Sequence, residues 1–330
     1  MTPGEAALRE SLEARRARLA ALAGARREEQ LVELVRRVDA ALAAVEIGEW
    51  SLCTVCHEPI TEEPWSSDPL IRVCLECLTA DERRALERDL EAAAKVQRAL
   101  LPPRQLVYGG WEVAFLWEPR GAVSGDHVDL VVPRGAGEPL HLLLGDVSGK
   151  GIAASLLQAH LHALFRALAS AETSPAELLE RANRLFVEAI PADRFATLAA
   201  LRLHGDGRVE LANAGHPRPL LADARGVRPV EGGGLPIGLF AGATYSGHDL
   251  RMAAGETLLL YSDGLAEAER DDEEYGIGRA AAALRRAAAR APVDVLAEVR
   301  ADLERFLAGA SRSDDLTLLV LRRSAVAPGS

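Results

Sequence analysis

The stretch Gly145-Asp-Val-Ser-Gly-Lys-Gly151 closes the apolar run Leu140–Gly145. It places Asp146 at the end of a predicted strand, between glycines that let a backbone pass close to a ligand. The stretch lacks the Gly-x4-Gly-Lys-Ser/Thr spacing of a nucleotide-binding loop. We therefore predict that its glycines bring backbone close to metal ions and that Asp146 is a metal ligand.

Three further segments combine small residues with aspartate. They are Ser124-Gly-Asp126, Ser262-Asp-Gly264 and Ser313-Asp-Asp-Leu-Thr317, the last two again beside apolar runs. A single Asp-Gly pair usually marks a turn, but four such segments need a common explanation. Carboxylates gathered from distant strands are typical ligands of Mg²⁺ or Mn²⁺, whereas zinc favours sulfur and imidazole.

Such a cluster predicts a reaction class. Two cations bridged by carboxylates lower the pKa of a shared water, hold a phosphate oxygen and offset charge during in-line attack. Phosphate ester hydrolysis would then need no nucleophilic side chain.

Short apolar runs from residue 104 onward occur in clusters, with amphipathic helices grouped between them rather than in strict βαβ alternation. This pattern predicts an α+β sandwich. The predicted helices cover about 151–170, 174–190, 277–290 and 292–309. The predicted strands are Trp111–Trp117, Val128–Val132, Leu140–Gly145, Ala196–Leu203, Val209–Ala212, Pro219–Ala222, Glu256–Tyr261 and Leu316–Leu321.

These segments resemble the PPM (type 2C) metal-dependent phosphatases, specifically the bacterial sporulation stage II E branch, over roughly residues 92–322. Besides the aspartate segments, the resemblance is carried by Lys95-Val-Gln-Arg-Ala-Leu-Leu-Pro102, Phe195-Ala-Thr197, Ala212-Asn-Ala-Gly-His-Pro217 and Leu235-Pro-Ile-Gly238.

The resemblance implies an αββα fold of two antiparallel sheets and a pair of Mn²⁺ or Mg²⁺ ions. The implied ligands are Asp126, Asp146, Asp263, Asp314 and the Val147 carbonyl. The implied substrates are phosphoserine or phosphothreonine proteins, typically anti-sigma-factor antagonists of the STAS type.

Two residues depart from the family pattern, in which Gly-Gly-Asp is followed by an aromatic residue. Ser124 fits in place of the first glycine only where the backbone avoids positive φ. His127 either replaces the aromatic ring without further effect, which we favour, or adds a pH-sensitive group beside the metals.

The four cysteines form two pairs, Cys53-x2-Cys56 and Cys74-x2-Cys77. Two such pairs at this separation predict one tetrahedral, structural zinc site with a closed shell of four thiolates. His57 is then a surface or supporting residue. The stretch Gly48–Ile60 with Cys74-Leu-Glu-Cys77 resembles the zinc finger of the DksA/TraR family.

In the DksA/TraR family the finger joins a coiled coil whose acidic tip enters an RNA polymerase channel. Here the middle of the first predicted helix reads Leu22-Ala-Gly-Ala-Arg-Arg27, without paired aspartates. The polymerase role is therefore not carried over, and we expect a structural or sensory module.

The chain is expected to divide into an N-terminal helical or coiled-coil segment (1–47), the zinc finger (48–78), a linker helix (79–101), the phosphatase domain (102–323) and a frayed tail (324–330). Thr79 and Glu82 have the spacing of a capping box at the start of the linker helix. Apolar stripes on the two predicted helices suggest that they pack antiparallel across the finger or form a homodimer.

Composition narrows the function classes. A length of 330 residues favours two units, and a net charge of −11 makes binding of nucleic acid through the overall surface unfavourable. The opening residues show neither a signal peptide nor an apolar membrane span. Clustered cysteines fit a metal site in a reducing compartment, so we expect a cytoplasmic protein.

Several residues near the aspartates have two interpretations each. Lys150 and Arg312 are either solvated charges or phosphate contacts. His216 with Asn213 either shapes a turn, which we favour, or donates a proton to the leaving group. Two further aspartates, Asp129 and Asp315, are expected to support the ligands.

Two functions follow from different parts of the chain. The first is a phosphatase that the finger and helices dimerise, position or regulate. The alternative is a catalytically weak module whose finger docks on transcription machinery. A register change in the linker helix would be a natural switch, since this helix runs directly into the catalytic domain.

Overall fold

The computed structural model describes residues 3–25, 29–60, 70–133, 135, 137–170, 173–191 and 194–324. Of the predicted features, Arg26 and Arg27 at the helix tip and all but Ser324 of the tail lie outside these ranges. The chain forms two compact units, Met1–Asp89 and Leu90–Ser330.

The first unit begins with a helical hairpin. Helices α1 (Pro3–Ala25) and α2 (Glu29–Glu46) pack on each other, so the prediction of one helix over this segment was wrong. Leu12 of α1 joins Val38, Ala41 and Val45 of α2 in a small apolar core. The apolar stripes that suggested a longer helix therefore bury each other within the chain.

The described part of the cysteine segment, residues 48–60 and 70–78, is irregular. It has an isolated bridge between Leu52 and Pro59 and a 3₁₀ helix, η2 (Leu75–Cys77). Helix α3 (Ala80–Leu100) follows, and its capping box is confirmed. The Thr79 backbone N–H donates to Glu82 Oε2 at 2.9 Å, and the Glu82 N–H donates to Thr79 Oγ1 at 3.3 Å.

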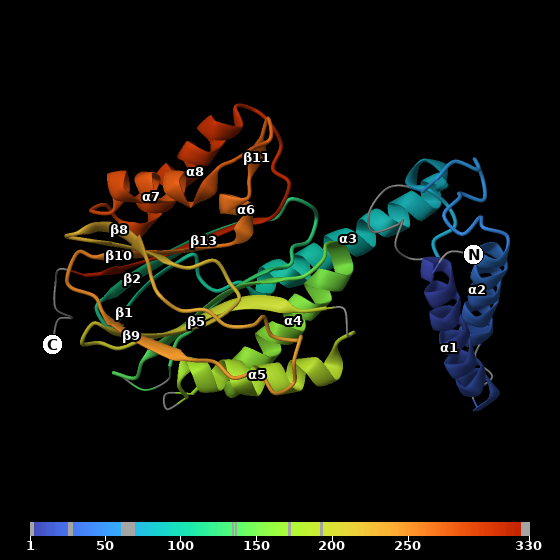
Figure 1. Cartoon of the computed structure of the whole chain (residues 1–330), viewed down its shortest axis with the longest axis horizontal. Helices are drawn as coiled ribbons and strands as arrows, with labels where there is room; N and C mark the ends of the chain where they lie inside the picture. The colour runs from blue at the N-terminus through green and yellow to red at the C-terminus, as the bar shows by residue number, and fades with distance from the viewer. Residues whose placement is uncertain are drawn as a thin grey trace. The chain divides into compact units, whose positions relative to one another are not determined.

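The second unit contains two large antiparallel sheets (Figure 1). The six-stranded sheet has the order β1-β2-β13-β10-β7-β8, and the five-stranded sheet has the order β3-β4-β5-β6-β9. The strands of the first are β1 (Gln105–Tyr108), β2 (Trp111–Glu118), β13 (Leu316–Arg323), β10 (Thr257–Tyr261), β7 (Leu220–Asp223) and β8 (Gly226–Pro229). Those of the second are β3 (Asp126–Val131), β4 (Leu140–Val147), β5 (Ala196–Leu203), β6 (Arg208–Ala214) and β9 (Gly247–Arg251).

Helices cover the outer face of each sheet. Helices α4 (Gly151–Leu168) and α5 (Pro175–Ala189) pack on the five-stranded sheet, and α7 (Gly276–Ala287) and α8 (Pro292–Leu307) pack on the six-stranded sheet (Figure 1). One apolar core fills the space between the sheets and a further core lies under each helix pair. The predicted αββα sandwich is confirmed.

The elements that the sequence did not predict are short or half-exposed. Strands β1, β8 and β9 have few buried residues, and helix α6 (Asp263–Ala266) is a single turn. The hairpin of β11 (Glu269–Arg270) and β12 (Glu273–Glu274) stands apart from both sheets. None of them has an apolar run long enough to reveal a strand or helix.

Candidate active site

The four predicted aspartates come from the same end of both sheets. Asp126 begins β3 and faces Asp146 of β4 directly in the strand register. Asp263 follows β10, and Asp314 precedes β13, the neighbour of β10. Each sheet therefore supplies two carboxylates, and the sandwich brings together side chains that are far apart in the sequence.

The electrostatics show carboxylates that are buried together and repel one another. Burial raises the pKa of Asp146, and repulsion from Asp126, Asp263 and Asp314 adds to the increase. Burial also raises the pKa of Asp126, against the opposing effect of a hydrogen bond from Thr317. The pKa of Asp263 is raised by burial and then by Asp314. Such a set binds divalent cations well, because a bound ion removes the repulsion.

The carboxylates do not converge on a single point. Within the described part of the chain, the sets of three or more cysteine, histidine or acidic residues with all ligand atoms within 4.8 Å are the four cysteines and His127–Asp129–His162. The wider spacing of the four aspartates suits two ions better than one.

Asp315 fixes the turn that precedes Asp126. Its Oδ2 accepts from Ser124 Oγ at 2.7 Å and from the Gly125 N–H at 3.1 Å, and its Oδ1 accepts from the Arg120 N–H at 2.6 Å. Ser124 Oγ also accepts from the Asp126 N–H at 3.0 Å. Asp315 is thus a supporting residue, as expected.

Ser124 is also compatible with the turn. It is not among the residues with positive φ, so a side chain fits there without strain. Its hydroxyl makes two contacts that a glycine would lack.

Two hydroxyl residues orient Asp126 from the other sheet. Thr317 Oγ1 donates to Asp126 Oδ2 at 2.5 Å, and the Thr317 N–H donates to Ser262 Oγ at 2.9 Å. The sequence contained both residues in its motifs but gave no sign of these roles. They depend on β13 lying beside β10 in one sheet and against β3 of the other sheet.

Two glycines are required by close backbone contacts. A Cβ at Gly125 would lie 2.9 Å from the Val147 carbonyl oxygen, and one at Gly264 would lie 1.9 Å from the Asp315 carbonyl oxygen. A side chain at position 125 would therefore crowd the Val147 carbonyl, whose place among the ligands stays a prediction.

Cations near the cluster have distinct roles. Lys150 Nζ lies 3.0 Å from Asp314 Oδ2 and donates to the Ser313 carbonyl at 3.1 Å. Arg312 instead pairs with Glu118 at 2.5 Å. Lys150 is therefore placed at the aspartates, whereas Arg312 is held by a structural ion pair.

A chain of side-chain amides leads from α3 to β3. Gln97 accepts from the Ser124 N–H at 3.0 Å and donates to the Ser124 carbonyl at 2.7 Å, which fixes its orientation. Its amide also donates to Gln158 Oε1 at 3.2 Å, so Gln158 must donate to His127 Nδ1 at 3.0 Å. His127 accordingly carries its proton on Nε2. Sequence reasoning assigned no role to Gln97 or Gln158.

His127 takes the place of the aromatic ring, which is the interpretation that we favoured from the sequence. It is fully buried and stacks on Phe165 with a centroid distance of 5.9 Å. Burial lowers its pKa to about 4, so the ring is neutral at neutral pH. The alternative of a group titrating near pH 7 is not supported.

The His127–Asp129–His162 set is already compensated by a guanidinium. Arg166 of α4 donates to both oxygens of Asp129, at 2.7 and 2.5 Å. The amide chain also leaves a proton on His127 Nε2, where a metal would need a lone pair. This group is therefore a structural link between α4 and β3.

The Asn213–His216 turn has the expected side-chain bonds. Asn213 donates to the His216 carbonyl at 2.9 Å and accepts from the His216 N–H at 2.8 Å. Burial lowers the pKa of His216 to about 3, so no imidazolium is present there at neutral pH. A protonated His216 acid is therefore not supported.

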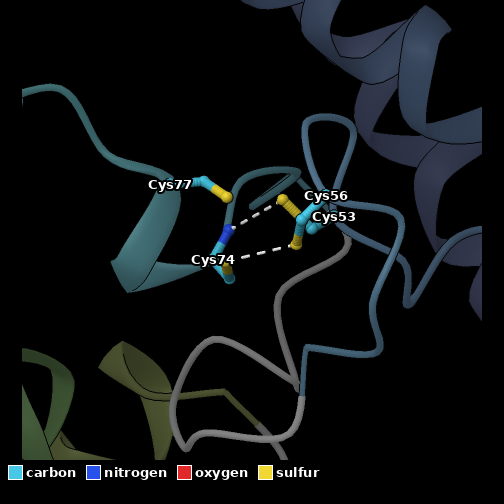
Figure 2. Close-up of side chains that lie close together, drawn as sticks. All are labelled: Cys53, Cys56, Cys74 and Cys77. Carbon is cyan, nitrogen blue, oxygen red and sulfur yellow. Dashed lines mark hydrogen bonds between the residues drawn. The ribbon is translucent and has the colours of Figure 1, made fainter.

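The four cysteines face one another in the first unit, Cys53 and Cys56 from one turn and Cys74 and Cys77 from the other (Figure 2). Cys56 Sγ lies 3.8 Å from Cys74 Sγ. A tetrahedral zinc with bonds of about 2.3 Å separates its sulfurs by about 3.8 Å. The cluster therefore has the dimensions of a zinc site.

The first thiolate of this cluster is stabilised before any metal binds. Burial raises the pKa of Cys53, but backbone N–H groups, including those of Val55 and Cys74 at 3.4 Å, outweigh it and lower the pKa to about 6. Hydrogen bonding to Cys74 is the main cause that raises the pKa of Cys77 to about 12. His57 is exposed and is not part of the cluster.

The described helices include none long and apolar enough to cross a membrane.

Comparisons with known proteins agree with this geometry. Residues 136–324, more than half of the chain, match the family model of Stage II sporulation protein E (SpoIIE). Phosphoserine phosphatase RsbU of Bacillus subtilis is 24% identical over 188 residues, and Protein IcfG of Synechocystis is 23% identical over 266 residues. These matches cover 56% and 72% of this chain, but only 55% and 42% of the relatives. The chain thus spans about half the length of these curated relatives.

Solved structures share the fold. The SiaA-PP2C domain of Pseudomonas aeruginosa matches with a TM-score of 0.64 and 21% identity, over 74% of this chain and 98% of that one. The RsbU and RsbW domains of Rv1364c from Mycobacterium tuberculosis match with a TM-score of 0.59 and 29% identity, over 69% of this chain and 63% of that one. Together with the family match, these results show that the chain belongs to the SpoIIE family, with a phosphatase domain of the PP2C fold.

Proposed function

We propose that the chain is a metal-dependent protein serine/threonine phosphatase. One observation carries the proposal: two sheets deliver Asp126, Asp146, Asp263 and Asp314 to one end of the sandwich, where burial and mutual repulsion leave them in need of cations. Membership of the SpoIIE family supports the same activity.

These aspartates and the Val147 carbonyl would hold two Mn²⁺ or Mg²⁺ ions. Bound there, the pair would supply an activated water and neutralise charge on the phosphate. The chain's own residues arrange the site: Thr317 orients Asp126, and Asp315 holds the Ser124–Gly125 turn. Lys150 provides a cation beside Asp314 that is free to meet a phosphate oxygen once ions neutralise the carboxylates.

The substrate we propose is a phosphoserine or phosphothreonine on a regulatory protein, probed first with an anti-sigma-factor antagonist of the STAS type. The relative RsbU is named a phosphoserine phosphatase, and another relative joins an RsbU domain to an RsbW domain. The four cysteines are unpaired, so the compartment we propose is a reducing cytoplasm.

The test is phosphate release from a phosphoserine peptide and from a phosphorylated STAS-type protein, with added Mn²⁺. We expect turnover by the wild type and none by Asp146→Ala. Turnover that survives Asp146→Ala, or a wild type that is inactive at every Mn²⁺ and Mg²⁺ concentration, would refute the mechanism.

For the first unit, we propose a structural zinc held by Cys53, Cys56, Cys74 and Cys77 and a regulatory role transmitted by α3. The support is that α3 starts beside the module and carries Gln97 in its last turn, where Gln97 bonds to both backbone groups of Ser124. Cys53→Ser is then expected to change Mn²⁺-dependent turnover or dimerisation. Unchanged turnover and an unchanged oligomeric state would eliminate the regulatory role.

A second candidate function rests on the α1–α2 hairpin. A helical hairpin beside a four-cysteine module is the arrangement expected of a DksA/TraR-like polymerase-binding element. Size-exclusion chromatography of the full chain with purified RNA polymerase tests it. Separate elution at micromolar concentrations of both proteins would exclude this function.

A further inference from the structure

Strand β2 is paired along its whole length on one edge only. Strand β13 pairs with all of β2, whereas β1 pairs with residues 111–114 on the other edge. The last bond on the β1 side runs from the Phe115 N–H to the Arg104 carbonyl at 3.2 Å. Pro102 and Pro103 come just before Arg104 and have no N–H with which to continue the ladder. The end of β2 therefore has an open edge.

Trp117 presents its main chain at this open edge. In an antiparallel strand, the N–H and C=O of one residue point to one edge, and those of the next residue point to the other. Trp117 therefore faces the same edge as Phe115, at a point where β1 has already ended. Within the described residues, the Trp117 N–H has no acceptor. A strand edge of this kind can pair with an extended segment of another chain.

Two cavities of about 390 and 270 Å³ lie along the open edge. Both are lined by Arg104 and Phe115, so they adjoin, and we call them together the β2 groove. Trp117 and Leu101 line the larger cavity, and Val293 of α8, which is 37% exposed, lines the smaller one. Their joint volume lies in the range of about 300–1,000 Å³ that is typical of ligand sites.

The walls of the β2 groove are positively charged, although the whole chain has a net charge of −11. Among the described residues, these walls include Arg98, Arg104 and Arg300 and no acidic residue. Arg300 is paired with Glu118 at 2.7 Å and with Glu304 at 3.0 Å. In the part of the chain that the structure describes, the exposed guanidinium groups of Arg98 and Arg104 have no hydrogen-bond or ion-pair partner. They are therefore available to carboxylates of another molecule.

These features favour an acidic peptide over other ligands. An extended chain supplies a carbonyl for the Trp117 N–H, and its successive side chains point to opposite faces. Its carboxylates would meet Arg98 and Arg104, and its apolar side chains would cover Val293. A small anion would leave the apolar walls uncovered, and the net charge of the chain would repel a nucleic acid.

We propose that the β2 groove binds an extended acidic segment of a partner protein. The segment pairs its main chain with Trp117 and its carboxylates with Arg98 and Arg104. The groove is lined by none of the four aspartates, so binding there does not require phosphatase activity.

The test measures binding of fluorescein-labelled decapeptides to the full-length protein by fluorescence anisotropy at low salt. The probe alternates glutamate and valine. One comparison peptide alternates lysine and valine, and the other is the probe with an N-methylated main chain. We expect a micromolar Kd for the probe, no binding of the lysine peptide, and a Kd about tenfold higher after N-methylation, since main-chain hydrogen bonds are lost.

Arg98→Glu and Arg104→Glu should each raise the Kd of the probe about tenfold, because an ion pair is replaced by repulsion. Arg225→Glu is the matched control. It makes the same change of charge at the exposed turn between β7 and β8, at the opposite edge of the same sheet, and should leave the Kd at the wild-type value.

Three results would overturn the docking site: a wild type that does not bind the probe, equal binding of the lysine peptide, or a Kd that neither arginine variant changes more than Arg225→Glu does. Equal binding of the N-methylated probe would overturn the pairing with Trp117.

Discussion

The carboxylate cluster and the cysteine cluster are assembled in opposite ways. The four aspartates are buried or half-buried at the ends of strands from two sheets, whose cores form without any metal. The four cysteines lie within residues 53–77, on turns and one 3₁₀ helix with few buried side chains. The comparison predicts that the fold creates the first site without a metal, whereas the segment around the second depends on a bound metal to fold.

The largest expected effect is at the carboxylate cluster, where one substitution should lower activity and raise thermal stability. Asp126→Asn keeps an acceptor for Thr317 but removes a buried charge that neighbouring aspartates repel. Activity should fall at least about 100-fold, because a metal ligand is lost. In EDTA, the thermal midpoint of the variant should rise above that of the wild type.

Phosphate release and thermal unfolding in EDTA measure the two effects on the same preparation. A midpoint that falls together with activity would mean that Asp126 stabilises the fold, and the contrast between the two clusters would be lost.

The second expected effect concerns the cysteine cluster. Cys74→Ser should reduce bound zinc from about one ion per chain to none and unfold the surrounding segment, because zinc binding supplies its folding free energy. His57→Ala is the control, since His57 is exposed beside Cys56 and outside the cluster. Metal analysis and limited proteolysis would detect the change. Zinc retained by Cys74→Ser would argue against a four-thiolate site.

The third prediction uses pH to probe the catalytic unit alone. Burial lowers the pKa of His216 from 6.5 to about 3, so unfolding takes up a proton between these values. The contribution of His216 to the free energy of unfolding is fully present above pH 6.5 and is lost as the pH falls toward 3. The loss is about 2 kcal/mol between pH 7 and pH 5. His216→Gln should lack this component.

Urea unfolding at pH 7 and pH 5 compares the two proteins, with the second unit monitored by its own tryptophans, Trp111 and Trp117. An identical loss of stability in wild type and variant would show that other groups cause the acid sensitivity.

The smallest expected effect is at the helix that begins in one unit and ends in the other. Thr79→Ala removes the hydroxyl that accepts from the Glu82 N–H and donates to the Glu82 carboxylate, and should cost about 1 kcal/mol at the first turn of α3. Hydrogen exchange of the first amides of α3 should accelerate, while exchange near Gln97 stays at the wild-type rate. Faster exchange along the whole helix would show that α3 opens as one cooperative element.

The sequence predicted those parts of the fold whose signals are local. Long apolar runs identified the central strands, and residue spacing identified the capping box and the paired cysteines. The weakly patterned edge strands escaped detection. The break between α1 and α2 was also missed, because a stripe such as Leu12 with Leu19 looks the same whether it packs on α2 or on another chain.

The candidate site likewise has residues that the sequence pointed to and residues that it did not reveal. Family resemblance pointed to the aspartates, and the structure brings them to one end of the sandwich, while their role as ligands stays a prediction. The supporting bonds of Thr317, Asp315 and Gln97 could not be foreseen, because each joins segments that only the finished sheets bring together.

The position of β13 has a consequence for biosynthesis. It is the last strand of the domain to leave the ribosome, yet it lies between β2 and β10 in the middle of its sheet. Until it emerges, Asp126 lacks Thr317, the turn at Ser124 lacks Asp315, and β2 has a free edge. A nascent chain therefore carries most of the domain without a complete aspartate cluster, and the cluster is completed only with the final residues of the domain.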